Sequence, residues 1–485
     1  MKINKILVLF LIFLLIVLTR FYFVFQTDYF HNDSYLSKRY IDNIAETGKP
    51  IFYDTLSYNG RDVLYSPVFY YIMAFFKGIF GDLALKLIPG LFLSLLVFIV
   101  YFSAKKLTND NNLSLFVALM SGFIPIIFAE TMNKISIYSL ILPILFCLAY
   151  LFMEFNGNIK LFLFLMFLLT LLHPSVFLFL IALIFYILIL STENLEMSKL
   201  KKELILFSIF LILFVEFLIY KKAFLEYGMS VIWGNVPYQI LTHYFNFSFL
   251  EFIYKIGILP IIFGFIGIII AFYKKIESSF LLISIIFSTL FLLWFRLIDA
   301  IVGMIFLAIA LVIISAVGLK VMLNYLERTK LKKPKLIFYS GLIILFILTL
   351  FVPSYIDASN NLKEIPNNYE ILVLEWIKDN ALPDVSVLAP IEKGFLVEEI
   401  AGKRTVIDKN FLLAPDTSER YRDIETIYST KSEVEALEII KKYNIDYILL
   451  PVEIELKYKG VKWLDDKHCF EQAFIGTPKV FKVVC

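Results

Sequence analysis

The chain has 485 residues, of which 60% are hydrophobic and only 18% are charged, with a net charge of +3 and a mean hydropathy of +0.81. Because soluble globular domains carry about 25% charged residues, this composition excludes a purely soluble protein. Apolar runs long enough to cross a bilayer, about 20 residues each, recur along the sequence. The three cysteines exclude a disulfide-rich scaffold and form no zinc-binding pattern. The sequence therefore predicts a polytopic α-helical membrane protein.

The apolar runs define the predicted spans. The first run is longer than a signal-peptide core and lacks a small-residue cleavage site, so we expect a retained span. The stretch 66–81 is apolar for too short a distance to cross and predicts an amphipathic helix at the outer interface. About eleven spans are predicted, at residues 4–25, 84–104, 113–129, 135–153, 159–172, 175–190, 204–220, 256–273, 279–295, 299–319 and 336–352.

Lysine and arginine residues gather in alternate loops between these spans. Such an asymmetry follows the positive-inside rule and predicts a cytoplasmic N-terminus. An odd number of spans then places residues 353–485 outside, on the same side as the large polar first loop at about 26–83. We expect a multi-pass cell-membrane protein whose C-terminal domain is extracytoplasmic. The basic positions lie at residues 2–5, 105–106, 160, 199–202, 274–275 and 320–335.

One long apolar run, 159–190, is interrupted by His173, Pro174 and Ser175. The run is too long for one span, and proline disfavours helix in the residue before it. We therefore expect two helices joined by a tight turn at the outer face. His173 either caps this turn or contributes to a ligand site.

Residues 353–485 have a different composition, with frequent charged residues. Helical spacing at 369–380 and 432–444 alternates with β-like runs at 385–390, 404–408 and 447–451. Ser432 and Glu435 have the spacing of a capping box. This alternation predicts a small α/β domain.

Cys469 and Cys485 bracket a predicted β-hairpin at the end of the chain. Counting back from a turn at residues 476–477 pairs Cys469 with Val484, one residue out of register for Cys485. An exported domain allows a disulfide, and the spacing leaves its formation open.

This layout suits either a transporter or an enzyme that acts on lipid-linked substrates. Transporters usually place polar residues inside their spans and show repeat symmetry between halves. Here the predicted spans are nearly free of charge, no internal repeat is evident, and acidic residues gather in the first outer loop. The arrangement favours a site at the outer membrane interface.

The polar loop at 31–81 and the end of the next predicted span contain a set of acidic, aromatic, glycine, proline and lysine positions, namely Asp33, Tyr35, Gly48, Pro67, Tyr70, Tyr71, Lys105 and Lys106. With these residues the loop resembles the first outer loop of the GT-C glycosyltransferases, membrane enzymes that use polyprenyl-phosphate sugars. It is most similar to the branch that includes protein O-mannosyltransferases and aminoarabinose transferases. Ser34 stands where the family often has a second acid, and the resemblance allows a divalent metal, Mg²⁺ or Mn²⁺, as a cofactor.

Later segments also resemble this family. Glu130 lies in a segment similar to the second outer turn, and Arg296 in one similar to the late hairpin where an arginine meets the lipid phosphate. Residues 388–411 resemble the start of the outer domain of oligosaccharyltransferase catalytic subunits. Those subunits carry Trp-Trp-Asp-Tyr-Gly for sequon recognition, whereas this chain has PIEKG at 390–394, so peptide-sequon recognition is not supported.

The resemblance implies roles for Asp33 and Arg296. An aspartate near the membrane surface would take the acceptor proton, and the attack would invert the anomeric carbon. An arginine would bind the phosphate bidentately and keep its charge. Each has a structural alternative, because Asp33 could cap the following helix and Arg296 could pair with Asp299. Other candidate site-lining residues are Glu130, His173, Arg61, Tyr70, His31, Asp54, Asp62 and His243.

The leading hypothesis is an inverting membrane glycosyltransferase. It would transfer a sugar from a polyprenyl (dolichyl) phosphate to a protein, lipid or glycan acceptor on the outer face. An oligosaccharyltransferase-like transfer of a lipid-linked glycan is one alternative, and a non-catalytic or transport protein on the same scaffold is the other. Membrane lipids are expected partners, and nucleic acid is not.

Overall fold

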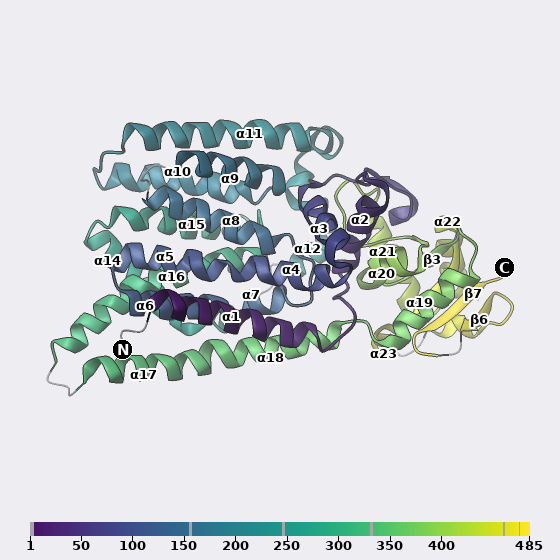
Figure 1. The fold of residues 1–485 in the computed structure, drawn as a ribbon. Coiled ribbons are helices and arrows are strands. Elements are labelled where there is room, and N and C mark those ends of the chain that lie inside the picture. Colours follow the sequence, from purple (N-terminus) through teal and green to yellow (C-terminus); the bar gives the residue numbers. More distant parts are fainter. Residues whose placement is uncertain (1–3, 155–157, 245–247, 330–332, 459–460, 475) are drawn as a thin grey trace. The chain divides into compact units, whose positions relative to one another are not determined.

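The structure is a computed structural model that describes residues 4–154, 158–244, 248–329, 333–458, 461–474 and 476–485 (Figure 1). The chain divides into two compact units. The predicted domain boundary at residue 353 is based on a change in amino-acid composition and stays a prediction. The two units are instead defined by which residues lie close together in space. Unit 1 contains Met1–Asp28, Ser66–Ile219 and Tyr244–Leu362, and unit 2 contains Tyr29–Tyr65, Tyr220–His243 and Lys363–Cys485.

Unit 1 is built from helices over its described residues. Its helices are α1 (Lys5–Val24), α3 (Val68–Phe80), α4 (Leu83–Ser94), α5 (Leu96–Thr108), α6 (Asn111–Gly122), α7 (Pro125–Glu130), α8 (Tyr138–Glu154), α9 (Ile159–Leu172), α10 (Val176–Thr192), α11 (Lys199–Tyr227), α13 (Phe249–Ile256), α14 (Ile258–Tyr273), α15 (Glu277–Trp294), α16 (Ala300–Glu327), α17 (Pro334–Phe346) and α18 (Val352–Asn361). A π-helical turn, η3 (Ile347–Phe351), joins α17 to α18, and α11 continues into unit 2.

Each predicted span falls on one of these helices or on a pair of them. Six helical stretches of the described chain are long and apolar enough to cross a membrane, and the bent pair α13 and α14 would make a seventh. Helices α8, α9 and α10 are apolar but have 17 residues or fewer, so they reach at most about 26 Å, slightly less than the hydrocarbon core. The chain is thus a mostly helical protein with about six candidate spans, and eleven spans stay a proposal.

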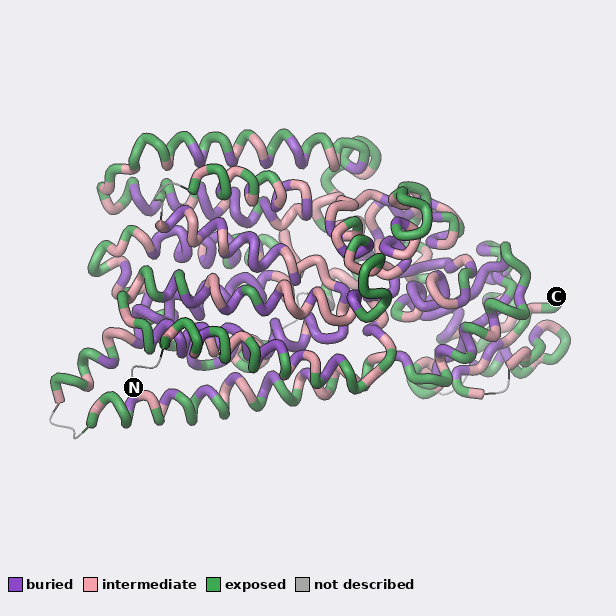
Figure 2. The backbone as a smooth tube through the Cα atoms, in the orientation of Figure 1, coloured by how far each residue is buried: buried purple, intermediate pink, exposed green. Residues whose placement is uncertain are grey.

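Helices α14 and α16 approach each other closely because glycine lines their contact. A Cβ atom at Gly267 would lie 2.4 Å from the carbonyl oxygen of Ile314, and one at Gly318 would lie 2.3 Å from that of Phe263. Small residues allow membrane helices to pack backbone against backbone. Accordingly, α16 is the most enclosed of the six candidate spans, whereas more than half of the residues of α11 are exposed (Figure 2).

The predicted break in the run 159–190 separates α9 from α10. The backbone N–H of Ser175 donates to Nδ1 of His173 at 3.0 Å, and the Ser175 hydroxyl lies 2.8 Å from the same nitrogen. His173 therefore caps this turn, as one of the two interpretations of the sequence expected.

The C-terminal part of unit 2 contains a mixed five-stranded sheet of order β4-β3-β5-β7-β6. Strand β3 is parallel to β4 and β5, whereas β7 is antiparallel to β5 and β6. The helices and strands predicted along this segment are present, and α21 is a further helix that the sequence analysis did not predict. Their bounds are α19 (Asn368–Asn380), β3 (Ser386–Leu388), β4 (Arg404–Thr405), α21 (Thr417–Ser429), α22 (Glu433–Tyr443), β5 (Ile445–Leu450), β6 (Phe470–Phe474) and β7 (Lys479–Val483).

The polar first loop folds together with this sheet. Tyr58 is buried in the same hydrophobic cluster as Leu388 and Ile448, and the N–H of Thr405 donates to the carbonyl oxygen of Leu56 at 2.8 Å. Residues from 29–65 and 363–485 therefore share one core. The loop contributes α2 (Ser34–Thr47), β1 (Tyr53–Asp54), η1 (Ser57–Asn59) and β2 (Arg61–Asp62), while α12 (Tyr238–Tyr244) follows in the segment after α11.

The predicted hairpin register is confirmed. Phe470 pairs with Val483, and the N–H of Val484 donates to the carbonyl oxygen of Cys469 at 3.0 Å. Cys485, one residue further on, nevertheless forms a disulfide with Cys469, across a Cα–Cα distance of 4.8 Å. The offset of one residue does not prevent the bond.

The capping box at the start of α22 is only half present. Ser432 Oγ accepts from the N–H of Glu435 at 3.4 Å, as predicted. The Glu435 carboxylate instead accepts from the hydroxyl of Thr430, and the same hydroxyl oxygen accepts the N–H of Ser432 at 3.0 Å. The second hydrogen bond of the predicted capping box, from the N–H of Ser432 to the Glu435 carboxylate, is therefore absent, because the Thr430 hydroxyl binds both groups.

Candidate functional site

Asp33 occupies the N-cap position of α2 without capping it. Its backbone is already helical (φ −65°, ψ −18°), and its side chain makes no capping hydrogen bond. A capping side chain normally reaches back from an extended backbone, so the capping interpretation is wrong. The carboxylate lies 3.0 Å from Nζ of Lys409 and 3.5 Å from Nδ1 of His31, with 43% of the side chain exposed.

His31 lies between two carboxylates and is largely buried. Its Nδ1 accepts the backbone N–H of Asp33 at 3.3 Å, and its Nε2 lies 3.6 Å from a carboxylate oxygen of Glu364. Because Nδ1 accepts from the backbone, we assign the proton of the neutral ring to Nε2, on the side of Glu364. The side chain of Glu364 is 67% exposed, so the imidazole connects Asp33 to an exposed carboxylate.

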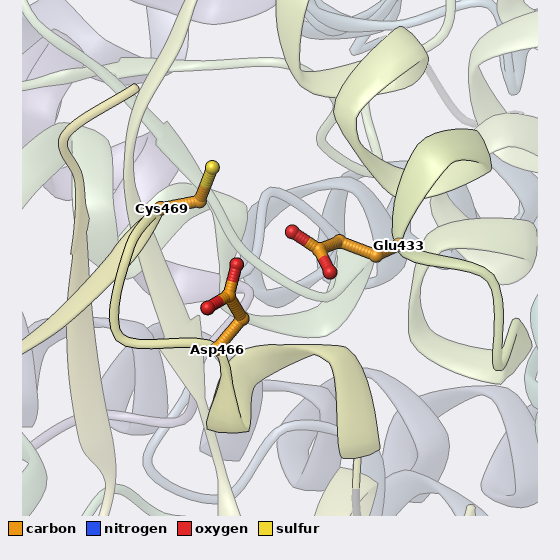
Figure 3. A group of neighbouring side chains, drawn as sticks. All are labelled: Glu433, Asp466 and Cys469. Carbon is orange, nitrogen blue, oxygen red and sulfur yellow. The ribbon is translucent and has the colours of Figure 1, made fainter.

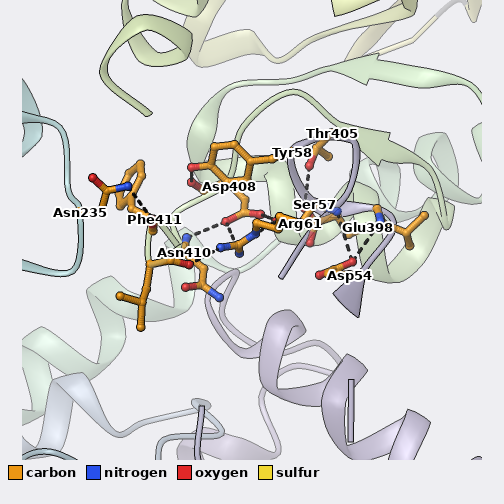
Figure 4. Close-up of polar contacts among 12 residues, drawn as sticks. Asp54, Ser57, Tyr58, Arg61, Asn235, Glu398, Thr405, Asp408, Asn410 and Phe411 are labelled. Atoms are coloured by element: carbon orange, nitrogen blue, oxygen red, sulfur yellow. Dashed lines mark hydrogen bonds and ion pairs between the residues drawn. The ribbon is translucent and has the colours of Figure 1, made fainter. Parts of the chain in front are cut away.

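Lys409 takes its position from the buried residue before it. The Asp408 side chain accepts hydrogen bonds from the Ser57 hydroxyl and, at 2.6 Å, from the N–H of Asn410 (Figure 4). The hydroxyl of Tyr58 donates to the carbonyl oxygen of Asp408 at 2.8 Å. The first loop therefore holds the turn from which Lys409 reaches Asp33.

Arg61 lies inside this network. Its Nε donates to the Ser57 hydroxyl at 2.7 Å, and one terminal nitrogen donates to the carbonyl oxygen of Leu412 at 2.8 Å. The other terminal nitrogen lies 3.7 Å from Asp408. These contacts make Arg61 a positioning residue for the 408–412 segment, and its predicted site-lining role stays a prediction.

A second part of the network joins α2 to the C-terminal part of unit 2. Arg39 forms ion pairs with Asp54 and, at 3.2 Å, with Glu398. Burial raises the pKa of Glu398 well above its usual value, and the charge of Asp408 adds to this effect, whereas Arg39 opposes it. The sequence analysis missed Arg39 and Glu398. The available signal was that Arg39 lies one turn after Tyr35, on the buried face of an amphipathic helix.

The residues around Asp33 do not fit a divalent metal. An ammonium group already lies against the carboxylate, and Ser34 supplies no second acid. Among the described residues, one group has metal-ligand spacing, formed by Glu433, Asp466 and Cys469 within 4.8 Å (Figure 3). The sulfur of Cys469 is bonded to Cys485 and cannot act as a thiolate ligand. No step of the chemistry is therefore assigned to a metal.

In unit 1, Glu130 and His173 are connected through two further residues. Glu130 interacts electrostatically with Asp299, which caps α16 by accepting the N–H of Ile301 at 2.7 Å. Asp299 in turn interacts with Tyr138, whose ring packs edge-on against the His173 ring at 5.4 Å between centroids. The structure thus brings two predicted site residues into one neighbourhood.

The other predicted residues of unit 1 lie on helix ends or faces. Arg296 follows α15, takes a positive φ of 54° and is exposed. Tyr70 is half-buried in α3, and its ring packs edge-on against Phe69 at 5.5 Å. The side chain of His243 lies outside the described residues. The roles of Arg296 and Tyr70 stay predictions.

The fold is similar to that of solved oligosaccharyltransferases, whereas no protein-family profile and no curated protein matches the sequence. The apo form of the Archaeoglobus fulgidus oligosaccharyltransferase aligns with a TM-score of 0.66 at 14% identity, covering 96% of this chain and 72% of that one. AglB from the same organism, in complex with an inhibitory peptide and a dolichol-phosphate, aligns with a TM-score of 0.66 at 14% identity over 94% and 70%. A complex with Zn and sulfate gives 0.60 at 13% over 92% and 68%. At these identities the likeness establishes that this chain has an oligosaccharyltransferase-like membrane fold.

Proposed function

We propose that this protein is an integral-membrane glycosyltransferase of the GT-C type. It transfers a sugar from a polyprenyl- or dolichyl-phosphate donor to an acceptor at the outer face of the membrane. The observation that carries the proposal is the oligosaccharyltransferase-like fold over 96% of the chain. A dolichol-phosphate complex of one similar protein supports a lipid-linked donor, and the acids and imidazole around Asp33 supply groups that can move a proton.

In this mechanism Asp33 is the base. It accepts the proton of the acceptor nucleophile while that atom attacks the anomeric carbon. The bond from this carbon to the phosphate oxygen breaks on the opposite side, and its electron pair leaves with the phosphate, so the configuration inverts. The Lys409 ammonium at 3.0 Å balances the charge of the ionised carboxylate. For the proton to leave Asp33 through His31, Nδ1 must exchange its hydrogen bond with the Asp33 N–H for the carboxyl proton while Nε2 releases its own proton toward Glu364.

Further roles follow from the same proposal. Arg296 contacts the departing phosphate, and Glu130, His173 and Tyr70 line the donor side of the site. Eleven spans place the N-terminus in the cytoplasm and residues 353–485 outside, where they shape the choice of acceptor. A cysteine introduced at Lys363 should react with an impermeant reagent in intact cells, and one at Lys335 should not. Labelling at residue 335 would contradict this topology.

The test uses a strain that lacks the protein. Mass spectrometry should find a polyprenyl-phosphate-linked sugar accumulating and a glycan missing from a protein, lipid or glycan acceptor. The wild-type chain should remove the accumulated lipid-linked sugar and return the missing glycan, whereas Asp33→Asn should do neither. No change in lipid-linked sugars or in glycans would refute the proposal. If the purified protein moved lipid-linked sugar across the bilayer of liposomes without transferring the sugar to an acceptor, the transport alternative would be favoured.

A second candidate is the transfer of a complete lipid-linked glycan, and the identity of the structural neighbours favours it. The two candidates differ in the mass that the acceptor gains. One sugar residue per event supports the single-sugar reaction, and an oligosaccharide supports transfer of a preassembled glycan.

A further inference from the structure

A buried arginine lies near the C-terminal end of α1. Arg20 is 3% exposed, and one terminal nitrogen donates to the Thr131 hydroxyl at 3.0 Å. The guanidinium carbon lies 4.8 Å from the centroid of the Phe128 ring. The Nε atom is enclosed and has no hydrogen-bond partner within the described chain. Arginine has five N–H donors, so most of its hydrogen-bonding capacity is unused.

The charge of Arg20 also lacks a counter-ion in the described part of the chain. No acidic side chain of the described residues forms an ion pair with its guanidinium, although the side chain is almost fully buried. Glu130, next to Thr131 in the sequence, is paired with Lys134 at 2.9 Å. A buried charge is costly unless it is paired, and ionisable groups inside membrane segments usually mark functional sites. This environment suits an anionic ligand.

A second cation lies along the contact between α1 and α4. A Cβ atom at Gly90 of α4 would lie 4.0 Å from Cδ of Arg20. Lys86 precedes Gly90 by one helical turn, and its Nζ donates to the carbonyl oxygen of Thr27 at 2.7 Å. Lys86 interacts with Asp28, so its charge is partly balanced. Of these two cations, Arg20 is the one whose charge is not balanced by an acidic side chain of the described residues.

We propose that Arg20 binds the phosphate of the lipid-linked donor and that Lys86 contributes a second contact. A guanidinium offers paired N–H donors that match two phosphate oxygens, and the phosphate replaces the neutral hydroxyl of Thr131. Arg20 lies about 6 Å along the axis from the end of α1, within reach of the interface where lipid phosphates lie. The inference rests on the proposed function for the identity of the lipid. A membrane phospholipid offers the same phosphate chemistry.

The experiment measures lipid binding to the purified full-length chain in nanodiscs. The probes are polyprenyl monophosphate, the same polyprenol without phosphate, and phosphatidylglycerol. Arg20→Met should weaken binding of polyprenyl monophosphate by about 10- to 100-fold, the worth of charge-assisted hydrogen bonds. Its melting temperature should stay equal or rise, because an apolar side chain replaces an unpaired buried charge. Arg404→Met, which removes an arginine paired with Asp384 at 2.9 Å, should bind like wild type.

Thr131→Val provides a second test if Arg20→Met does not fold. It removes the neutral partner and keeps the charge, so binding of polyprenyl monophosphate should stay equal or become tighter. Unchanged binding in Arg20→Met, or weaker binding in Thr131→Val, would overturn the inference. Equal weakening for phosphatidylglycerol and polyprenyl monophosphate would overturn the assignment to the donor. Intact, Arg20-dependent binding without any sugar transfer would instead refute the proposed function.

Discussion

Replacing Asp33 by asparagine should separate folding from chemistry. The Asp33 side chain makes no capping hydrogen bond, so the fold loses mainly its ion pair with Lys409. Both partners are partly exposed, at 43% and 31%, and exposed pairs of this kind contribute about 0.2–1 kcal/mol. We therefore expect Asp33→Asn to lose no more than about 1 kcal/mol of unfolding free energy.

The effect on catalysis should be much larger. An amide cannot accept the acceptor proton at working pH, so transfer should fall by about 10²–10⁴-fold. This corresponds to about 3–5 kcal/mol of activation free energy. Single-turnover transfer, donor binding and thermal unfolding should be measured on the same preparation. Donor affinity should stay close to that of the wild type, because Asp33 acts on the acceptor.

Asp42→Asn is the matched control. Asp42 lies on α2, the helix that follows Asp33, and pairs with Lys38 at 2.7 Å, with both side chains partly buried. Its loss should cost a similar amount of stability and leave transfer intact. Full transfer activity in Asp33→Asn would refute the base role. A parallel loss of transfer and stability in both variants would also refute it, because the defect would then be structural.

The remaining predictions concern unit 2. Lys409→Met should lower transfer by about tenfold or more, as for one charge-assisted hydrogen bond, and Lys409→Arg should restore most of it; wild-type activity in Lys409→Met would exclude a role for the ammonium. The raised folded pKa of Glu398 means that its contribution to stability is complete below its unfolded pKa of about 4.3 and lost as pH rises through the folded value. Thermal melts of Glu398→Gln should therefore decline less with rising pH than those of the wild type, and parallel curves would contradict this sign. Replacing Cys469 and Cys485 by serine should cost up to about 3 kcal/mol by the chain-entropy model, measured by denaturant unfolding without reductant; an unchanged midpoint would argue against the bond.

Features set by local sequence were predicted well. Every predicted span falls on helix, because a membrane helix satisfies its own backbone hydrogen bonds and its apolar run marks its position. The hairpin register could also be predicted from the sequence, because counting from the turn pairs Cys469 with Val484, as observed. Neither feature depends on distant parts of the chain.

The residues that surround Asp33 could not be predicted from the local sequence. An aspartate before a helical pattern is usually a cap, but residues 31–35 already form turns, with the N–H of Ser34 bonded to the carbonyl oxygen of His31 at 2.9 Å. This turn makes the backbone of Asp33 helical and removes the geometry that a cap needs. Lys409 follows Asp33 by 376 positions, and no periodicity in the sequence relates residues so far apart.

The buried network explains how such distant residues reach one site. Two guanidinium groups, Arg39 and Arg61, lie among three carboxylates, Asp54, Glu398 and Asp408. Burial and the charge of Asp408 raise the pKa of Glu398 well above its usual value, whereas Arg39 opposes this shift. Buried ion pairs add little net stability against an apolar core, but removing one partner leaves a costly unpaired charge. The network therefore disfavours any arrangement in which α2 separates from the 408–412 turn. This constraint keeps the carboxylate of Asp33, which directly precedes α2, beside Lys409.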